Sequence, residues 1–177
     1  MNLSIIIPAF NEEESIKPLV NLIFKNLDKN LEDFEIILID DGSNDKTWAE
    51  IVKISNKFEN IVSIKLLENY GKSDALDAGF KVCKGNYVLT MDADLQDDPS
   101  EILPLYSMII ENKYDLVSGW KKKRNDPLTK TIPSKFFNLV TRLFSGIKLN
   151  DFNCGIKIYR KEVINSINLY GEMHRYI

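Results

Sequence analysis

Three groups of acidic residues follow short apolar runs, where a cation and phosphate groups can be bound. They are residues 8–13 (Pro-Ala-Phe-Asn-Glu-Glu), 40–43 (Asp-Asp-Gly-Ser) and 92–98 (Asp-Ala-Asp-Leu-Gln-Asp-Asp). At the carboxyl edge of a parallel sheet, where ligands usually bind, these carboxylates would repel one another unless a cation joined them. Mg²⁺ and Mn²⁺ prefer oxygen ligands and are commonly shared with substrate phosphates. The sequence therefore predicts a divalent-ion site that holds a diphosphate.

The third group carries the best candidate ligands. In an extended segment, alternation puts the carboxylates of Asp92 and Asp94 on one face, and the small Ala93 between them leaves room for a ligand. Asp94 and Gln96 are the preferred metal ligands, with Asp92 beside them. The ion would neutralise charge as the bond to a diphosphate leaving group breaks. An isolated Asp-x-Asp is a weak signal, because most acidic loops are merely solvated; the preceding buried strand strengthens it.

The strands and helices that position these groups are inferred from the spacing of the apolar residues. Short apolar runs alternate with segments of helical period, which predicts an α/β fold with a parallel sheet covered by helices. The expected strands are residues 4–8, 35–40, 61–67, 87–91 and 115–118.

Several residues bear on where the expected helices begin. Pro18 would break a helix that began at Glu12, so the first helix is expected either to begin near Lys17 or to be irregular in its first turn. Asn44 or Asp45 is expected to cap the second helix, and Pro99 to open another.

Composition bounds the remaining choices. The chain has 177 residues and 44% hydrophobic content, which suits one domain, and its two cysteines form no disulfide framework or zinc motif. The N-terminus lacks the features of a signal peptide. No uncharged apolar run approaches the roughly 18 to 20 residues of a membrane-spanning helix.

The charge is distributed unevenly. Residues 1–120 contain 22 acidic and 11 basic residues, whereas residues 121–177 contain 4 acidic and 12 basic residues. This asymmetry favours an anionic partner, either a diphosphate or lipid headgroups, over a merely solvated basic face. The apolar and basic segment 130–148 fits a helix on a membrane surface, and equally a core-facing helix with a basic outer side. We expect no nucleic acid partner, and a homo-oligomer is left open.

Four motifs in order carry a family resemblance: residues 5–13, 39–45, 69–72 and 91–96. They resemble the signature of GT-A-fold family 2 glycosyltransferases, and more narrowly the dolichyl-phosphate mannose synthase and bacterial polyprenyl-phosphate glycosyltransferase branch. The resemblance continues to Arg175 and covers nearly the whole chain.

The resemblance implies a GT-A, Rossmann-like and mostly parallel sheet in a single catalytic domain over residues 1–177. Donor and metal binding would occupy residues 1–120, and the acceptor side with a membrane-surface segment residues 121–177. Members of this branch usually continue further, so we expect the chain to be truncated at its C-terminus.

The resemblance also assigns roles on the donor side. It implies that Pro8, Phe10 and Glu12 hold the base and ribose, although the family often has tyrosine at the position of Phe10. Asp40 matches the residue that reads the base. The metal and diphosphate segment matches Asp92, Ala93, Asp94 and Gln96, with Asp94 and Gln96 as direct ligands.

Further assignments concern the phosphates and the acceptor. Lys121 falls where mannose synthases tend to have an arginine near the phosphates, and keeps the charge without the bidentate fork. Asp151 matches a carboxylate close to the acceptor. We do not expect it to be a strong general base, because a phosphate monoester with a second pKa of about 6 is already largely ionised at neutral pH. Arg175 is a candidate phosphate clamp, and Lys72 a phosphate contact outside any P-loop.

These observations predict an inverting, metal-dependent enzyme with Mg²⁺ or Mn²⁺ as cofactor. It would move a hexose from a UDP- or GDP-sugar to a polyprenyl (undecaprenyl or dolichyl) phosphate on the cytoplasmic face of the membrane. One alternative is a saccharide acceptor in polysaccharide or cell-wall synthesis. Another is an inactive nucleotide-binding module. A sugar nucleotidyltransferase is disfavoured, because no glycine-rich phosphate loop lies near the N-terminus.

Overall fold

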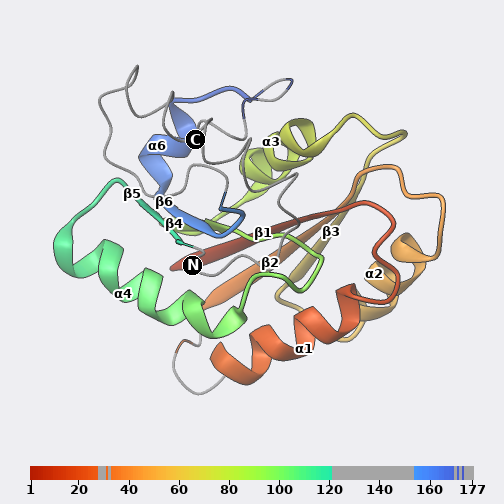
Figure 1. Ribbon diagram of the computed structural model, residues 1–177, viewed down its shortest axis with the longest axis horizontal. Helices are drawn as coiled ribbons and strands as arrows, with labels where there is room; N and C mark the ends of the chain where they lie inside the picture. Colours follow the sequence, from red (N-terminus) through yellow and green to blue (C-terminus); the bar gives the residue numbers. More distant parts are fainter. Residues whose placement is uncertain (28–30, 32, 121–153, 170, 172, 174–177) are drawn as a thin grey trace, which may run out of the picture.

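A six-stranded sheet forms the centre of the computed structural model, which describes residues 1–27, 31, 33–120, 154–169, 171 and 173 (Figure 1). The strand order is β3-β2-β1-β4-β6-β5. The strands are β1 (Leu3–Ala9), β2 (Phe34–Asp40), β3 (Ile61–Lys65), β4 (Tyr87–Thr90), β5 (Leu116–Ser118) and β6 (Lys157–Arg160). β3, β2, β1 and β4 pair in parallel, and β6 runs antiparallel to both of its neighbours. The predicted α/β, mostly parallel sheet is therefore confirmed.

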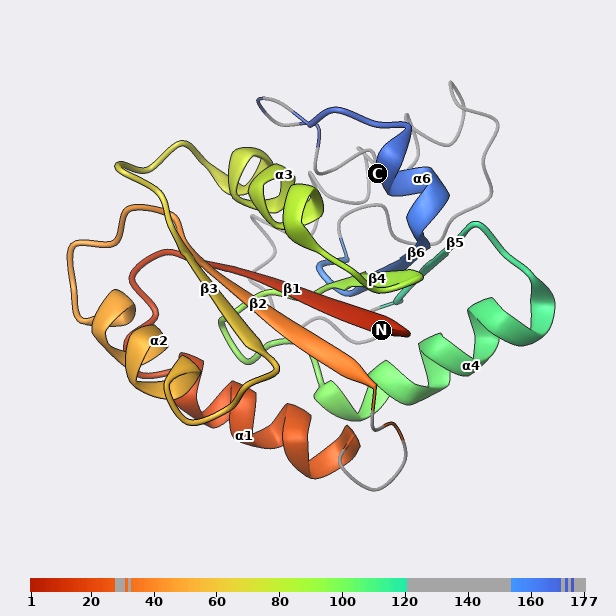
Figure 2. The ribbon, with the colours of Figure 1, turned by 180° about the vertical axis from the view of Figure 1, so that it is seen from behind.

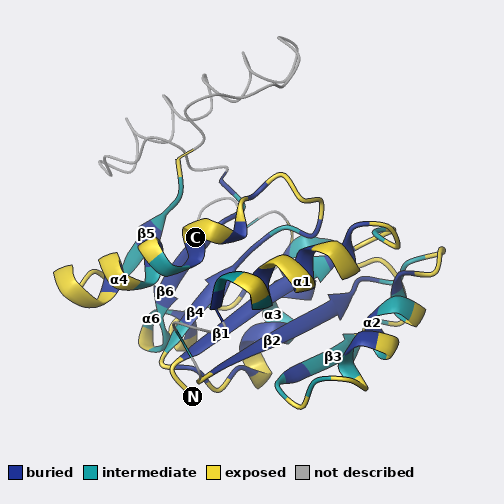
Figure 3. Cartoon of the chain, turned by 90° about the horizontal axis from the view of Figure 1, so that it is seen from below, coloured by how far each residue is buried: buried dark blue, intermediate teal, exposed yellow. Residues whose placement is uncertain are grey.

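Helices cover both faces of the sheet (Figures 1 and 2). One face carries α1 (Ile16–Leu27), α2 (Thr47–Ser55) and α4 (Ile102–Asn112), and the other carries α3 (Lys72–Val82) and α6 (Lys161–Asn165). A short 3₁₀ helix, η1 (Pro99–Glu101), precedes α4. Alternation along β1 explains the two cores, because Ile5 and Ile7 pack toward α1 whereas Ile6 packs toward α3. The central strands β1 and β2 are buried, the edge strands β3 and β5 are mostly half-buried, and the outer sides of the helices are exposed (Figure 3).

The expected element boundaries agree with the structure within a few residues. α1 begins at Ile16, so Pro18 lies in the first turn, where backbone N–H groups have no intrahelical partner. Pro99 opens η1, and Asp98 Oδ1 accepts from Ser100 N at 2.9 Å. The cap expected for α2 differs: Lys46 is the N-cap, and Asp45 Oδ1 accepts from Thr47 N at 2.9 Å from one residue earlier.

The strand β6 was not predicted from the sequence. Its four residues, Lys-Ile-Tyr-Arg, are too few to show a period, and they follow residues outside the described part of the chain. The segment 130–148 also lies outside the described residues, so neither interpretation of it is tested. Among the helices of the described residues, none combines the length and the hydropathy that a bilayer span requires.

Candidate functional site

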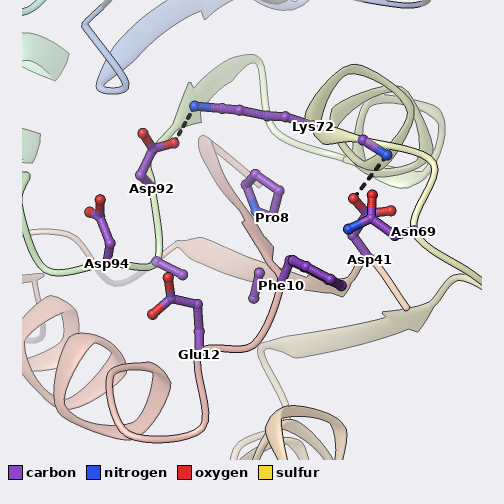
Figure 4. A pocket seen from close by; sticks show the side chains of 11 residues that line it. Pro8, Phe10, Glu12, Asp41, Asn69, Lys72, Asp92 and Asp94 are labelled. Carbon is purple, nitrogen blue, oxygen red and sulfur yellow. Dashed lines mark hydrogen bonds and ion pairs between the residues drawn. The ribbon is translucent and has the colours of Figure 1, made fainter. Parts of the chain in front are cut away.

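A cavity of about 380 Å³ lies at the carboxyl ends of β1, β2 and β4 (Figure 4). It combines residues of the three acidic groups with the loop that leads into α3. The lining residues are Pro8, Ala9, Phe10, Glu12, Asp41, Asn69, Gly71, Lys72, Asp92, Ala93 and Asp94. The structure thus brings together most of the residues predicted for the donor side. This place is the usual ligand-binding edge of an open parallel sheet.

Hydrogen bonds tie the loop after β1 to the loop after β2. Asn11 N donates to Ser43 Oγ at 2.9 Å, and Asn44 N donates to Asn11 Oδ1 at 2.9 Å. Glu12 N donates to Thr47 Oγ1 at 2.7 Å. Asn11 adopts a left-handed backbone with φ 57°, which asparagine tolerates better than most residues. These contacts fix the backbone from which Phe10 and Glu12 reach the cavity.

Asp41 lines the cavity and anchors the loop before α3. Its buried carboxylate accepts from Tyr70 N at 2.9 Å and from Gly71 N at 3.0 Å. Burial raises the pKa of Asp41 above its usual value, and the nearby Asp74 carboxylate adds to that rise, whereas the two backbone hydrogen bonds oppose it.

Asp40, to which the sequence assigned base reading, is fully buried and is not among the lining residues. Its Oδ1 accepts from Ser43 N at 3.1 Å. β2 ends at Asp40, and Asp41 is the first residue after the strand. Of the two aspartates, Asp41 is the one that lines the cavity.

Gly42 permits the close approach of the two loops around Asp41. Its φ is +69°, and a Cβ at this position would lie 2.3 Å from the carbonyl carbon of Glu68. Any larger residue would therefore push residues 68–71 away from Asp41.

Lys72 and Asp92 form an ion pair across the cavity (Figure 4). Lys72 is the first residue of α3, and its side chain reaches the loop after β4 to contact Asp92 Oδ1. Each side chain retains 32% exposure. The predicted phosphate-binding lysine thus lies within reach of the predicted metal-binding segment.

Asp94 and Gln96 are separated by a sharp turn. Leu95 adopts a left-handed conformation with φ 61°, and Gln96 N donates to Asp94 Oδ1 at 3.0 Å. As a result Asp94 lines the first cavity, whereas Gln96 lines a second cavity of about 260 Å³ together with Asp97 and Trp120. The predicted ligand pair Asp94 and Gln96 therefore does not face one cavity in this structure.

The donor set fits a hard divalent ion that is shared with a ligand. Carboxylate oxygens of Asp92, Asp94 and Glu12 line one cavity, as Mg²⁺ and Mn²⁺ require. Within the described residues, no group of three or more His, Cys, Asp or Glu side chains is already assembled around a common point. Mg²⁺ is usually bound through one or two carboxylates with the rest of its shell from water and phosphate, so such a partial set is adequate.

Several predicted site residues cannot be placed. Lys121, Asp151 and Arg175 lie outside the described residues. Conversely, Asp41, Asn69 and Gly71 line the cavity without having been assigned a role. The signal for all three was present, because they belong to the second and third of the four motifs.

Two curated proteins with similar sequences are named as enzymes that act on polyprenyl phosphates. The chain is 37% identical to a dodecaprenyl-phosphate galacturonate synthase of Rhizobium johnstonii, over 100% of this chain and 53% of that protein. It is 35% identical to an undecaprenyl-phosphate 4-deoxy-4-formamido-L-arabinose transferase of Pseudomonas fluorescens, over 98% of this chain and 51% of that protein. The chain therefore spans about half the length of these relatives.

Solved structures share the fold at low sequence identity. S. aureus TarS matches with a TM-score of 0.68 and 24% identity, over 99% of this chain and 53% of that chain. The mannosyltransferase PcManGT from Pyrobaculum calidifontis, in complex with GDP-Man and Mn²⁺, matches with a TM-score of 0.67 and 18% identity. The match covers 93% of this chain and 46% of that chain. These neighbours confirm the predicted GT-A fold.

The family assignment rests on most of the chain. The family model described as glycosyl transferase family 2 matches residues 4–167, which include all three acidic groups and, apart from Leu3 at the start of β1, every described strand. Together with the two curated relatives above 30% identity, this match shows that the chain belongs to glycosyl transferase family 2.

Proposed function

We propose that this chain is the donor-binding part of an inverting, metal-dependent glycosyltransferase that loads a hexose from a nucleoside-diphosphate sugar onto a polyprenyl phosphate. The observation that carries the proposal is the shared cavity of Asp92, Asp94 and Lys72 at the carboxyl edge of the sheet. It pairs carboxylates for a divalent ion with a cation for a diphosphate. The names of the curated relatives support a polyprenyl phosphate as acceptor.

The chain's own residues have distinct tasks in this proposal. Pro8 and the exposed ring of Phe10 offer an apolar surface for the nucleoside at one side of the cavity. At the other side, Asp94 with Asp92 would hold Mg²⁺ or Mn²⁺, which supplies charge neutralisation for the departing diphosphate. Lys72 would contribute a further positive charge beside the oxygens of the diphosphate. Gln96 is proposed as a ligand only if the turn at Leu95 rearranges, because it now faces another cavity.

The reaction needs positioning more than proton transfer. An acceptor phosphate oxygen attacks the anomeric carbon, and the nucleoside diphosphate leaves from the opposite side, which inverts the configuration. Because a phosphate monoester is already largely ionised at neutral pH, no strong base is required. Holding the two anionic substrates in line therefore supplies most of the catalysis. Asp151 stays a proposed acceptor-side residue, and Lys121 and Arg175 stay proposed phosphate contacts.

The acceptor proposal includes a membrane surface on the cytoplasmic face. The 12 basic and 4 acidic residues of 121–177 suit anionic lipid headgroups. Sedimentation with anionic liposomes tests this part, and binding that is equal for neutral liposomes would contradict it.

A thermal-shift panel tests the donor class. UDP, GDP and their hexose derivatives are each added with and without Mn²⁺, and one nucleotide series is expected to stabilise the chain selectively. At a concentration of about 100 times Kd, the gain in unfolding free energy is about 2.7 kcal/mol.

Product analysis then tests the acceptor. The donor that binds is incubated with polyprenyl phosphate, and transfer is scored as sugar that partitions into the organic phase. Sugar transferred only to a soluble saccharide would replace the lipid acceptor by a saccharide. Nucleotide binding without any transfer would indicate a binding module.

A further inference from the structure

The ion pair between Lys72 and Asp92 occupies the carboxylate that the proposed metal site needs. Lys72 comes from the N-terminus of α3 and Asp92 from the loop after β4, so the pair links two loops that line the cavity (Figure 4). Neither side chain is fully exposed, since each keeps 32% exposure, and the pair is therefore partly shielded from water. A partly shielded charge that loses its partner must find another.

Charge balance shows why this lysine matters. Among the described residues that line the cavity, Glu12, Asp41, Asp92 and Asp94 are acidic, and Lys72 is the one basic residue. A diphosphate that enters meets an excess of negative charge. Its binding therefore requires a metal ion as an added cation. It also requires that the ammonium of Lys72 point toward the phosphates.

The two oxygens of Asp92 have different surroundings. Oδ1 accepts from Lys72 Nζ. A Cβ at Gly155 would lie 2.5 Å from Oδ2, so the glycine leaves the space beside this oxygen open. A divalent ion that binds the Asp92 carboxylate is brought close to the lysine ammonium at Oδ1, and the two cations repel each other strongly.

We propose that Lys72 is a resident counter-cation for Asp92, and that it moves from Asp92 to the donor diphosphate when the metal ion binds. This inference rests on the proposed donor class. Without a diphosphate, the displaced Lys72 ammonium stays beside the bound divalent ion, and the two cations repel each other. With a diphosphate present, the displaced ammonium gains a new partner. Lys72 thus couples metal binding to nucleotide binding, and each ligand raises the affinity for the other.

The substitution Lys72→Met tests the exchange by removing the ammonium while keeping an unbranched side chain. Mn²⁺ affinity of the nucleotide-free chain is measured from the electron paramagnetic resonance signal of free Mn²⁺, and it is expected to rise about tenfold. Metal-free affinity for UDP and GDP, measured by calorimetry, is expected to fall. Lys81→Met is the matched control, because Lys81 lies on the same helix and pairs with Asp77 outside the cavity. It should change neither affinity.

A second variant is expected to change the metal-free nucleotide affinity in the opposite direction. Asp92→Asn releases Lys72, so metal-free binding of UDP or GDP is expected to strengthen. Asp94→Asn removes the same charge without releasing the lysine, and should give a smaller gain. The difference between these two variants isolates the contribution of Lys72, even if Lys72→Met fails to fold.

The outcomes separate this inference from the proposed function. Unchanged or weaker Mn²⁺ binding in Lys72→Met, or no Mn²⁺ binding in any form, would overturn the exchange. Stronger Mn²⁺ binding in Lys72→Met, combined with no binding of UDP or GDP, would support Lys72 as the counter-cation and refute the donor class.

Discussion

The two edges of the parallel sheet handle buried charge in opposite ways. At the amino edge, the buried Glu35 of β2 accepts from Ser4 Oγ and from Lys84 N, each at 2.6 Å, and Ser4 Oγ accepts in turn from Gly85 N at 2.8 Å. At the carboxyl end of the same strand, Asp40 Oδ2 is buried and has no hydrogen-bond partner within the described part of the chain.

This contrast is between a buried carboxylate whose hydrogen bonds are made and the carboxyl edge, where a buried oxygen lacks a partner in the described part of the chain and other carboxylates line a cavity. A buried acid with its hydrogen bonds made stabilises one arrangement of the chain. At the carboxyl edge, four acidic side chains face a cavity with one lysine among the described lining residues. Two non-glycine residues nearby, Asn11 and Leu95, have positive φ, a conformation that is strained for most side chains. Such a concentration of charge and backbone strain is typical of a ligand-binding site.

The largest expected effect concerns activity at the carboxyl edge. Asp94→Asn should lower the transfer rate by about 100- to 1,000-fold, because it removes one charge that holds the ion at the leaving group. Its unfolding free energy should stay close to that of the unchanged chain, since Asp94 is exposed. Rates come from product assays and stability from urea unfolding. Asp77→Asn, on α3 and outside the cavity, serves as control; equal losses in both variants would contradict the assignment.

The next effect concerns stability at the amino edge. Glu35→Ala should lower the unfolding free energy by about 3 kcal/mol, because the buried donors on Ser4 and Lys84 lose their acceptor. Glu35→Gln keeps an acceptor oxygen and should cost less. Urea unfolding measures both, while nucleotide affinity of the folded fraction should not change. If Glu35→Ala proved neutral for stability, the contrast between the two edges would fail.

The smallest effect concerns backbone strain beside Asp94. Leu95→Gly should raise the unfolding free energy by about 1 kcal/mol, because a left-handed conformation costs leucine about 1–2 kcal/mol and glycine very little. Transfer should fall several-fold, since the turn that aims Asp94 becomes looser. The control is Leu67→Gly, an exposed leucine outside the positive-φ positions. A gain in stability for both variants would show that strain at Leu95 is not the cause.

Much of the fold followed from the sequence, because its signals are local. Five strands and the helices between them were predicted from short apolar runs and helical period, and proline marked the first turns of α1 and η1. The strand β6 was missed because its pairing with β4 and β5 depends on distant residues. A four-residue strand carries no pattern that reveals such partners.

The site was predictable as a set of motifs but not in its side-chain directions. Asp92, Asp94 and Lys72 were identified from order and spacing, and they share a cavity. The base-reading role of Asp40 stays a prediction, and the sequence did not indicate that Asp41, the residue after β2, lines the cavity whereas Asp40 is buried. The separation of Gln96 from Asp94 depends on the left-handed backbone conformation of Leu95. Leucine rarely adopts this conformation, so the residue type did not predict it.

The antiparallel pairing of β5 with β6 has an evolutionary consequence. Ser118 is paired with Lys157, and Gly119 N donates to Ile156 O at 3.0 Å, so the polypeptide leaves the sheet and re-enters it at the same point. The registers of the described strands therefore do not depend on the number of residues between these two positions, and an insertion or deletion there is compatible with the same sheet.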